Sequence, residues 1–155
     1  MRHRLFHVDT NLLNAKQRLV EMNELEKMAE KGIILLNWSS TAQSEVLNSE
    51  SQNLKRKAHT HIYTINDEDE EFPTTPSKFK NEIFKIMEIS SESSQNDIND
   101  ALIICEAQKY GAILISNDGG SKSQAKGILG RRNELKDYVQ VVTLSEALEI
   151  AKRCI

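Results

Sequence analysis

The chain has 155 residues, of which 39% are hydrophobic and 28% are charged, and its formal net charge is −3 at pH 7. A chain of this length buries roughly 70% of its unfolded surface, so one hydrophobic core is enough to stabilise it. The composition argues against a disordered chain, and no apolar run approaches the ~18 residues of a membrane span. We expect a single domain over 1–155. The basic start Met1-Arg2-His3-Arg4 is not followed by a long apolar segment. We therefore expect the protein in the cytoplasm and not at a membrane.

The first half of the chain alternates short apolar runs with helical patterns. We predict a strand over 4–8, a helix over 11–31 and a strand over 33–36. Ser40-Thr41-Ala42-Gln43 is a capping-box pattern, which predicts that another helix begins there. The stretch 48–80 is predicted to be a polar insertion or long loop, with strand-like alternation inside it and an exposed acidic run at its centre.

The second half continues the alternation. The expected elements are helices over 79–89, 95–110 and 121–135, strands over 112–115 and 139–142, and a terminal helix capped by Thr143. Ser94 to Asp97 is a second capping-box pattern, and Gly111 is expected to end the helix that it starts. Strands that alternate with helices indicate parallel strands with helical crossovers. The predicted fold class is therefore α/β, a three-layer α/β/α sandwich with a mainly parallel central sheet.

Acidic residues lie where apolar segments meet polar sequence. Asp9 ends the first strand, and Glu45 falls in the first turns of the helix after the second strand. Asp100 lies on the helix over 95–110, and Asp118 follows the strand over 112–115. Such positions can converge at one rim of a sheet, where open α/β folds bind their ligands. Since clustered carboxylates would repel one another, the pattern predicts a divalent metal ion between them.

The residue types favour magnesium or manganese over zinc. Both ions prefer oxygen ligands, and the acidic set contains neither His nor Cys. Cys105 and Cys154 lack the close spacing of a zinc or redox pair, so we expect reduced thiols, with Cys105 in the core. Hydrolysis of a phosphodiester needs an activated water and relief of charge on the phosphate, and divalent ions supply both.

The segments around these carboxylates match a known pattern in order, spacing and element type. They are His7-Val8-Asp9-Thr10-Asn11-Leu12-Leu13, Ser44-Glu45-Val46-Leu47, Asn99-Asp100-Ala101-Leu102-Ile103 and Leu114-Ile115-Ser116-Asn117-Asp118. In these segments the chain resembles the PIN-domain nucleases, and the resemblance covers nearly the whole chain apart from 48–80.

That resemblance implies a single PIN-like domain with the activity of a metal-dependent ribonuclease. It places the catalytic and metal-binding roles on Asp9, Glu45, Asp100 and Asp118, with Mg2+ or Mn2+ as cofactor. The supporting polar positions are Thr10, Asn11 and Ser116, with Asp97 one helical turn before Asp100. Many small members resemble the toxins of bacterial toxin–antitoxin pairs, which implies RNA, a protein inhibitor and a second copy of the chain as partners.

Basic residues follow the last carboxylate. We expect RNA contacts from Lys122, Lys126, Arg131 and Arg132, a stretch that continues to Lys136. A second basic run lies at 55–57. Each patch taken alone fits a solvated helix face equally well.

Each acidic residue also has a simpler interpretation. Asp9 could cap the following helix, Glu45 could be a solvated helix residue, and Asp118 could be a turn residue before Gly119. Asp97 has a ready explanation as the acidic member of a capping box. Elsewhere, His59 and His61 would share a strand face, which permits a pair of metal ligands but more often reflects exposed polar positions. Trp38 is expected to be a partly buried anchor after the second strand. Only the conjunction of the carboxylates favours a metal site.

Two other functions remain open at this stage. The first is a module on a nuclease-like fold that binds RNA or protein without cleaving, because Gly119-Gly120 follow Asp118 where many toxins have an acidic residue and a Phe. The second is an aspartyl-phosphate phosphatase with Asp9 as nucleophile. It is disfavoured because Asn11 stands where its general acid is expected.

Overall fold

The computed structural model describes residues 4–9, 12, 20–38, 41, 63–65, 78–117 and 127–155. Its strands are β1 (Arg4–Val8), β2 (Ile34–Trp38), β3 (Tyr63–Ile65), β4 (Ile113–Ile115) and β5 (Val141–Val142). The described strands form one five-stranded sheet in the order β3-β2-β1-β4-β5, and every neighbouring pair is parallel. The predicted α/β class with a mainly parallel sheet is confirmed.

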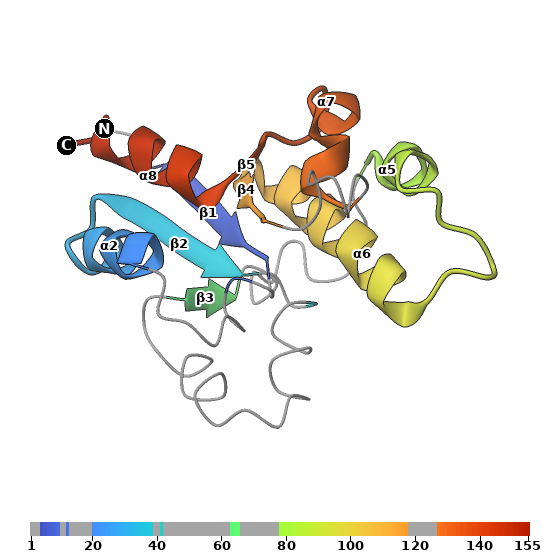
Figure 1. Cartoon of the computed structure of the whole chain (residues 1–155), viewed down its shortest axis with the longest axis horizontal. Coiled ribbons are helices and arrows are strands. Elements are labelled where there is room, and N and C mark those ends of the chain that lie inside the picture. The colour runs from blue at the N-terminus through green and yellow to red at the C-terminus, as the bar shows by residue number, and fades with distance from the viewer. Residues whose placement is uncertain are drawn as a thin grey trace.

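The helices form two groups. They are α2 (Val20–Glu30), α5 (Lys80–Ile86), α6 (Gln95–Tyr110), α7 (Arg132–Leu135) and α8 (Leu144–Lys152). Figure 1 shows α2 and α8 together on one side of the strands, and α5, α6 and α7 on the other. Consistent with this arrangement, α2 packs against β2 and α8, while α6 packs against β4 and α5.

The strand order contains a reversal between β1 and β4. From β1 the chain builds the sheet outward through β2 and β3, and it then returns to the other side of β1 for β4 and β5. In open α/β sheets, ligands bind outside the carboxyl ends of the strands at such a reversal. The residues that follow β1 and β4 are therefore candidates for a ligand-binding site.

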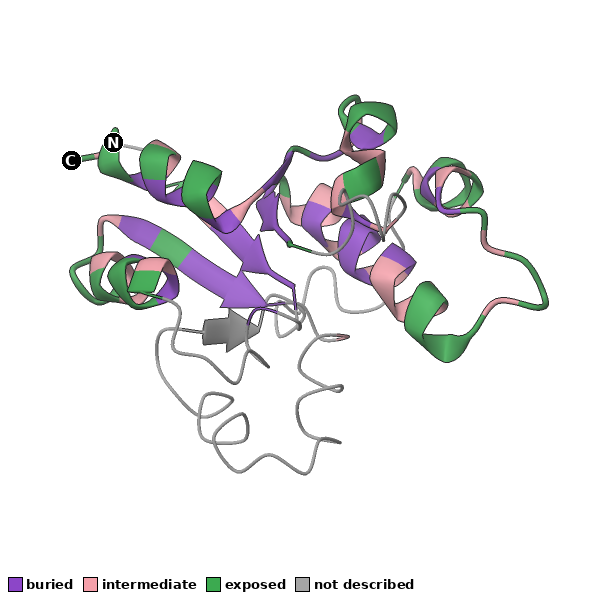
Figure 2. Cartoon of the chain, viewed as in Figure 1, coloured by how far each residue is buried: buried purple, intermediate pink, exposed green. Residues whose placement is uncertain are grey.

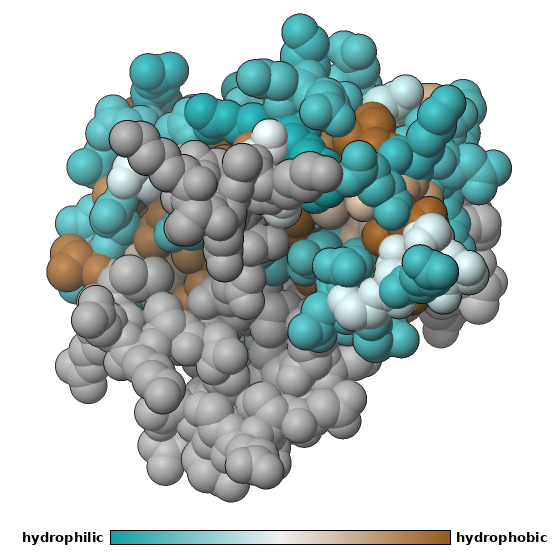
Figure 3. Space-filling view, turned by 45° about the vertical axis from the view of Figure 1, so that its right-hand side comes forward, coloured by the Kyte–Doolittle hydropathy of each residue, from teal (hydrophilic) through white to brown (hydrophobic). Residues whose placement is uncertain are grey.

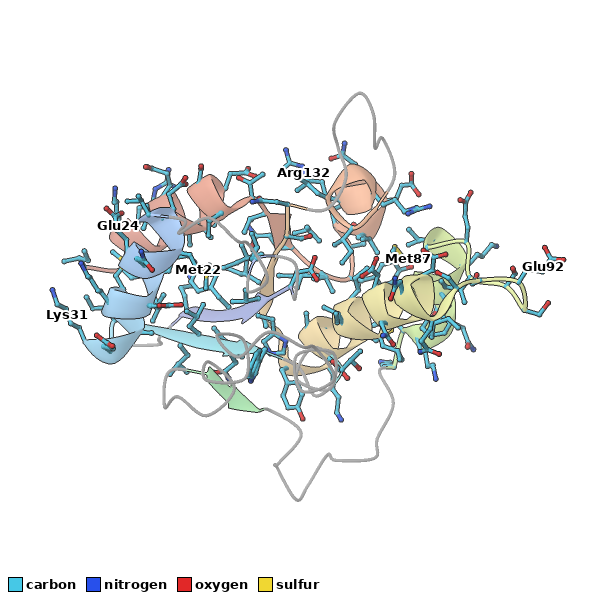
Figure 4. The ribbon with its side chains drawn as sticks, turned by 60° about the horizontal axis from the view of Figure 1, so that its bottom comes forward. Met22, Glu24, Lys31, Met87, Glu92 and Arg132 are labelled. Atoms are coloured by element: carbon cyan, nitrogen blue, oxygen red, sulfur yellow. The ribbon has the colours of Figure 1, made fainter. Side chains whose placement is uncertain are left out.

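The core runs along the inner strands, which are buried in Figure 2. Phe6 pairs in register with Leu36 and Ile113, so these side chains form an apolar row across one face of the sheet. Figure 4 shows Met22 directed from α2 into the molecule, in agreement with its 2% exposure. Trp38 is the last residue of β2 and is 0% exposed, so the expectation of a partly buried residue after the strand is wrong.

Capping side chains explain why two helices begin where the sequence predicts. The Ser94 hydroxyl accepts a hydrogen bond from the Asp97 N–H at the start of α6. At α8 the capping box is reciprocal: the Thr143 hydroxyl accepts from the Glu146 N–H, and the Glu146 carboxylate accepts from the Thr143 N–H. Each contact satisfies an amide that the helix itself leaves without an acceptor.

One predicted helix is interrupted in its described part. The predicted helix over 121–135 is not continuous in its described part, which holds a 3-10 turn over Leu129–Arg131 followed by the single turn of α7. Gly127 has a φ of +96°, a conformation that no helix contains, so the helix cannot extend through it. The predicted helix over 11–31 is helical at Leu12 and over α2, and the rest of it before Val20 lies outside the described residues. Most of 48–80 also lies outside them, apart from β3 and the residues from 78 onward.

The surface of the described residues carries few large hydrophobic side chains. Those that are exposed are Val20, Leu35 and Ile155. Figure 3 shows the described part of one face as largely hydrophilic, with small hydrophobic areas between. Within the described residues, no helix combines the length and apolarity needed to cross a bilayer.

Gly111 offers a test of how α6 is terminated. Its φ is +64°, and a Cβ built on it would meet nothing within 4 Å, so only backbone strain opposes a side chain there. We expect Gly111→Ala to lower the free energy of unfolding by about 1 kcal/mol and Gly111→Asn to lower it less, because Asn tolerates left-handed conformations. Urea denaturation of both variants measures this. Equal losses from both would show that the strain account is wrong.

Candidate functional site

Asp9 is held by backbone hydrogen bonds at the carboxyl edge of the sheet. It directly follows β1 and is 1% exposed. Its N–H donates to the carbonyl of Ile115 on β4 at 3.0 Å, and its carbonyl accepts from the N–H of Leu12 at 3.1 Å. These contacts extend the pairing of β1 with β4 to the strand end and begin a helical turn immediately afterwards. The carboxylate is thereby fixed at the reversal of the strand order.

Ser116 meets Asp9 from the neighbouring strand. It directly follows β4, is 0% exposed, and its Oγ donates to Oδ2 of Asp9 at 2.8 Å. Its backbone N–H donates to the carbonyl of Val142 on β5, which fixes its position. Burying a carboxylate is costly unless hydrogen bonds or an opposite charge compensate it. The neutral hydroxyl orients the Asp9 carboxylate but does not cancel its charge.

Two further polar residues are buried on the sheet beneath this pair. His7 of β1 pairs in register with Asn37 of β2, and they are 0% and 7% exposed. Because strand side chains alternate, His7 lies on the same face as Asp9. The His7 ring lies 6.1 Å from the ring of Tyr110, centroid to centroid, so the end of α6 covers this face. His7 was not among the predicted site residues, although the period-two alternation of a strand places it on the same face as Asp9.

Asp100 lies on the face of α6 that packs into the protein. Ile104 and Ala107, four and seven residues later, share this face and are both 0% exposed, whereas Asp100 has intermediate exposure. Only Gly111 and Ala112 separate α6 from β4, so the chain reverses and α6 runs opposite to the strands. Asp100, near the start of α6, therefore lies towards the carboxyl edge of the sheet.

A second carboxylate on α6 links it to the region that follows β2. The Thr41 hydroxyl donates to Oε1 of Glu106 at 2.8 Å, and both side chains are partly buried. Sixty-five positions separate the two residues in the sequence. No local pattern in the sequence indicates this contact, and Glu106 was not among the predicted site residues.

Several predicted site residues lie outside the described part of the chain. These are Glu45, Asp118, Thr10, Asn11, Lys122 and Lys126, together with His59 and His61. The convergence of the carboxylates therefore stays a prediction.

Within the residues that the structure does describe, no group of three His, Cys, Asp or Glu side chains could hold a metal ion. The described pair, Asp9 and Asp100, supplies the oxygen donors that magnesium prefers. Asp97 is exposed in the first turn of α6.

The two described arginines of the predicted RNA-binding set are both in ion pairs. Nη2 of Arg131 lies 3.2 Å from Oε2 of Glu88, and Nη1 of Arg132 lies 2.7 Å from Oε1 of Glu146. The Arg131 side chain is 14% exposed and that of Arg132 is 42% exposed. An RNA phosphate would have to compete with these carboxylates, and Arg132 is the more accessible of the two.

The cysteines have different environments. Burial raises the pKa of the Cys105 thiol to about 12, an effect that the nearby positive charge of Lys80 only partly opposes. Cys154 is partly exposed, and both cysteines are free thiols. The thiolate is the reactive species, so Cys105 is chemically inert at neutral pH and fits the core position predicted for it.

Comparisons with known proteins add no assignment. A scan against models of protein families finds no match to this chain, and a search of curated proteins finds none either. The resemblance to PIN-domain nucleases therefore depends on the residues of its four segments.

Thiol labelling tests the burial of α6. We expect one thiol per folded molecule, Cys154, to react quickly with an aromatic disulfide reagent at pH 8, because the pKa of Cys105 lies well above that pH. Unfolding in urea should expose the second. Rapid reaction of both thiols in the folded protein would contradict the packing of α6, and Cys154→Ser provides the control that isolates Cys105.

The contact between Ser116 and Asp9 can be tested by stability. We expect Ser116→Ala to lower the free energy of unfolding by about 1–3 kcal/mol, because the variant leaves a buried carboxylate without this donor. Ser145→Ala serves as the control, because the Ser145 hydroxyl also donates to a carboxylate, that of Glu21, but in an exposed contact that water can replace. A double-mutant cycle of Ser116→Ala with Asp9→Ala, which removes the acceptor, should show coupling between the two sites. Additive effects would contradict a direct hydrogen bond.

Proposed function

We propose that this protein is a metal-dependent ribonuclease with a PIN-like, three-layer α/β/α fold. One observation carries the proposal: the buried Asp9 carboxylate ends β1 at the reversal of the strand order, where Ser116 from β4 orients it. A carboxylate is rarely buried for stability alone, because desolvation disfavours its charge. Its position at the edge where open α/β folds bind ligands supports a role in binding or catalysis.

The proposed metal ligands are the carboxylates of Asp9, Glu45, Asp100 and Asp118. Oxygen donors of this kind suit Mg2+ or Mn2+. A bound divalent ion supplies activation of a water molecule and neutralisation of the phosphate charge. The packing of α6 supports the assignment of Asp100, because this residue extends the buried face of the helix towards the edge that holds Asp9.

The surrounding polar residues serve to orient these ligands. Ser116 holds one oxygen of Asp9 in place, and Thr10 and Asn11 directly follow Asp9 in the sequence. A rigid ligand set favours catalysis because little reorganisation is needed when the substrate binds. Basic residues after Asp118 would bind the RNA backbone, and of the two described arginines in this set Arg132 is more accessible than Arg131.

The biological setting follows from the resemblance alone. We propose a cytoplasmic protein that acts as the toxin of a toxin–antitoxin pair, is blocked by a protein inhibitor and forms a homodimer. Val20 at the start of α2 is 70% exposed, which suits a contact between the first helices of two copies.

Loss of the Asp9 charge tests the proposed mechanism. We expect the purified protein to cleave RNA in Mg2+ or Mn2+ and not in chelator, and we expect Asp9→Asn to reduce the rate by at least about a hundredfold. Asn retains an oxygen that can accept from Ser116, so the variant should remain folded, which circular dichroism and urea denaturation can verify. Asp100→Asn should show a similar loss.

Asp137→Asn is the matched control, because Asp137 is an exposed carboxylate of the same type. Its rate should equal that of the parent. Cleavage by Asp9→Asn at the parental rate would show that the assigned mechanism is wrong. A folded parent that binds RNA in chelator but never cleaves it would instead favour a binding module.

A further inference from the structure

The start of α8 lies at the same edge of the sheet as Asp9. α8 follows β5 directly, and the N–H of Leu144, its first residue, donates to Oδ1 of Asn117 at 3.4 Å. Asn117 is the residue after Ser116, which in turn donates to Asp9. A continuous series of contacts therefore connects the candidate site to the first turn of α8.

Glu146, in that first turn, receives two donors on one oxygen. Its Oε1 accepts from the Thr143 N–H at 2.9 Å and from Nη1 of Arg132 at 2.7 Å. The Thr143 N–H is the largest cause of a lowered pKa for Glu146, and the Arg132 guanidinium lowers it further. Glu146 is therefore ionised at neutral pH and pairs with Arg132 as an anion.

Arg132 remains accessible despite this pair. Its side chain is 42% exposed, and that of Glu146 is 47% exposed. Figure 4 shows Arg132 on the side of α7 that faces α8. The guanidinium has five N–H donors in a planar fork, the geometry that binds phosphate. The two charges thus meet at the edge of the sheet within reach of solvent.

We propose that Arg132 binds an RNA phosphate beside the candidate site, and that Glu146 is an internal counter-anion which the phosphate must displace. This inference rests on the proposed action on RNA and names the residues that set affinity for it. Glu146 competes with the phosphate for the guanidinium donors of Arg132. It therefore weakens any RNA contact that is made through Arg132.

The displacement does not disturb the fold. After Arg132 moves to a phosphate, Glu146 still accepts from the Thr143 N–H, so the capping box of α8 remains intact. Ion pairs between exposed side chains are weak, which limits the effect of Glu146 on RNA affinity to about a factor of five. The contact is therefore weak enough for RNA to displace.

Glu146→Gln tests the proposal because Gln also completes a capping box but has no charge. We expect this variant to bind a single-stranded oligonucleotide about two to five times more tightly than the parent. The readout is fluorescence anisotropy in chelator, where metal-dependent cleavage does not occur. Glu149→Gln removes the same charge from an exposed position one turn later on α8, and its affinity should equal that of the parent.

Arg132→Gln completes the cycle. It should weaken binding, reduce the slope of log affinity against log salt by about 0.7, and abolish the gain from Glu146→Gln. Urea denaturation of each variant verifies that α8 is intact. A gain that persists without Arg132, an equal gain from Glu149→Gln, no gain at all, or no RNA binding by the parent would each overturn the proposal.

The failure of this inference is distinct from failure of the nuclease assignment. If the parent cleaves RNA but binds it equally well with Glu or Gln at position 146, the nuclease assignment stands and the proposed role of Glu146 is wrong. A protein that shows the complete binding cycle but never cleaves would retain the Arg132 contact and lose the nuclease assignment.

Discussion

The hydrogen bond between Ser116 and Asp9 is the contact on which the candidate site depends. It joins the ends of β1 and β4, 107 residues apart in the sequence, at 2.8 Å. Both residues are buried, so the carboxylate has one orientation set by the parallel pairing of their strands. The sheet order places this contact at the reversal between the two halves of the fold. A change in the register of β4 by one residue would turn Ser116 to the opposite face and remove the donor.

The other elements of the site depend on the same strands. α6 precedes β4 by two residues, so the pairing of β4 also fixes how far the helix extends past the edge of the sheet. α8 follows β5, whose pairing with β4 brings Glu146 and Arg132 to that edge. The polar groups near Asp9 thus come from separate parts of the chain, and the parallel sheet assembles them. Carboxylates such as Asp9 can hold a cation, and the guanidinium of Arg132 can bind a phosphate. Together they would suit the proposed substrate, which carries phosphate.

The part of the fold that depends on neighbouring residues could be predicted from the sequence. β1 and α6 have the bounds that were expected, because a short apolar run, the Ser94 cap and the terminal Gly111 are signals that act on neighbouring residues. The expected helix over 121–135 was wrong in its described part because Gly127 adopts a positive φ that outweighs the helical spacing around it. Contacts such as Thr41 with Glu106 and Arg132 with Glu146 depend on packing between elements, so no pattern within a segment could indicate them. Asp9 and Asp100 were predicted as site residues because each stands where an apolar run meets polar sequence. His7 was missed because it lies inside an apolar run.

The most direct test of the account is calorimetric titration of Mn2+ into the purified protein, because metal binding at Asp9 is the premise of the proposed chemistry. We expect saturable binding that is weakened at least about tenfold by Asp9→Asn and by Asp100→Asn, with no change for Asp137→Asn. Equal Mn2+ affinity in the parent and in Asp9→Asn, or no binding by the folded parent, would contradict it.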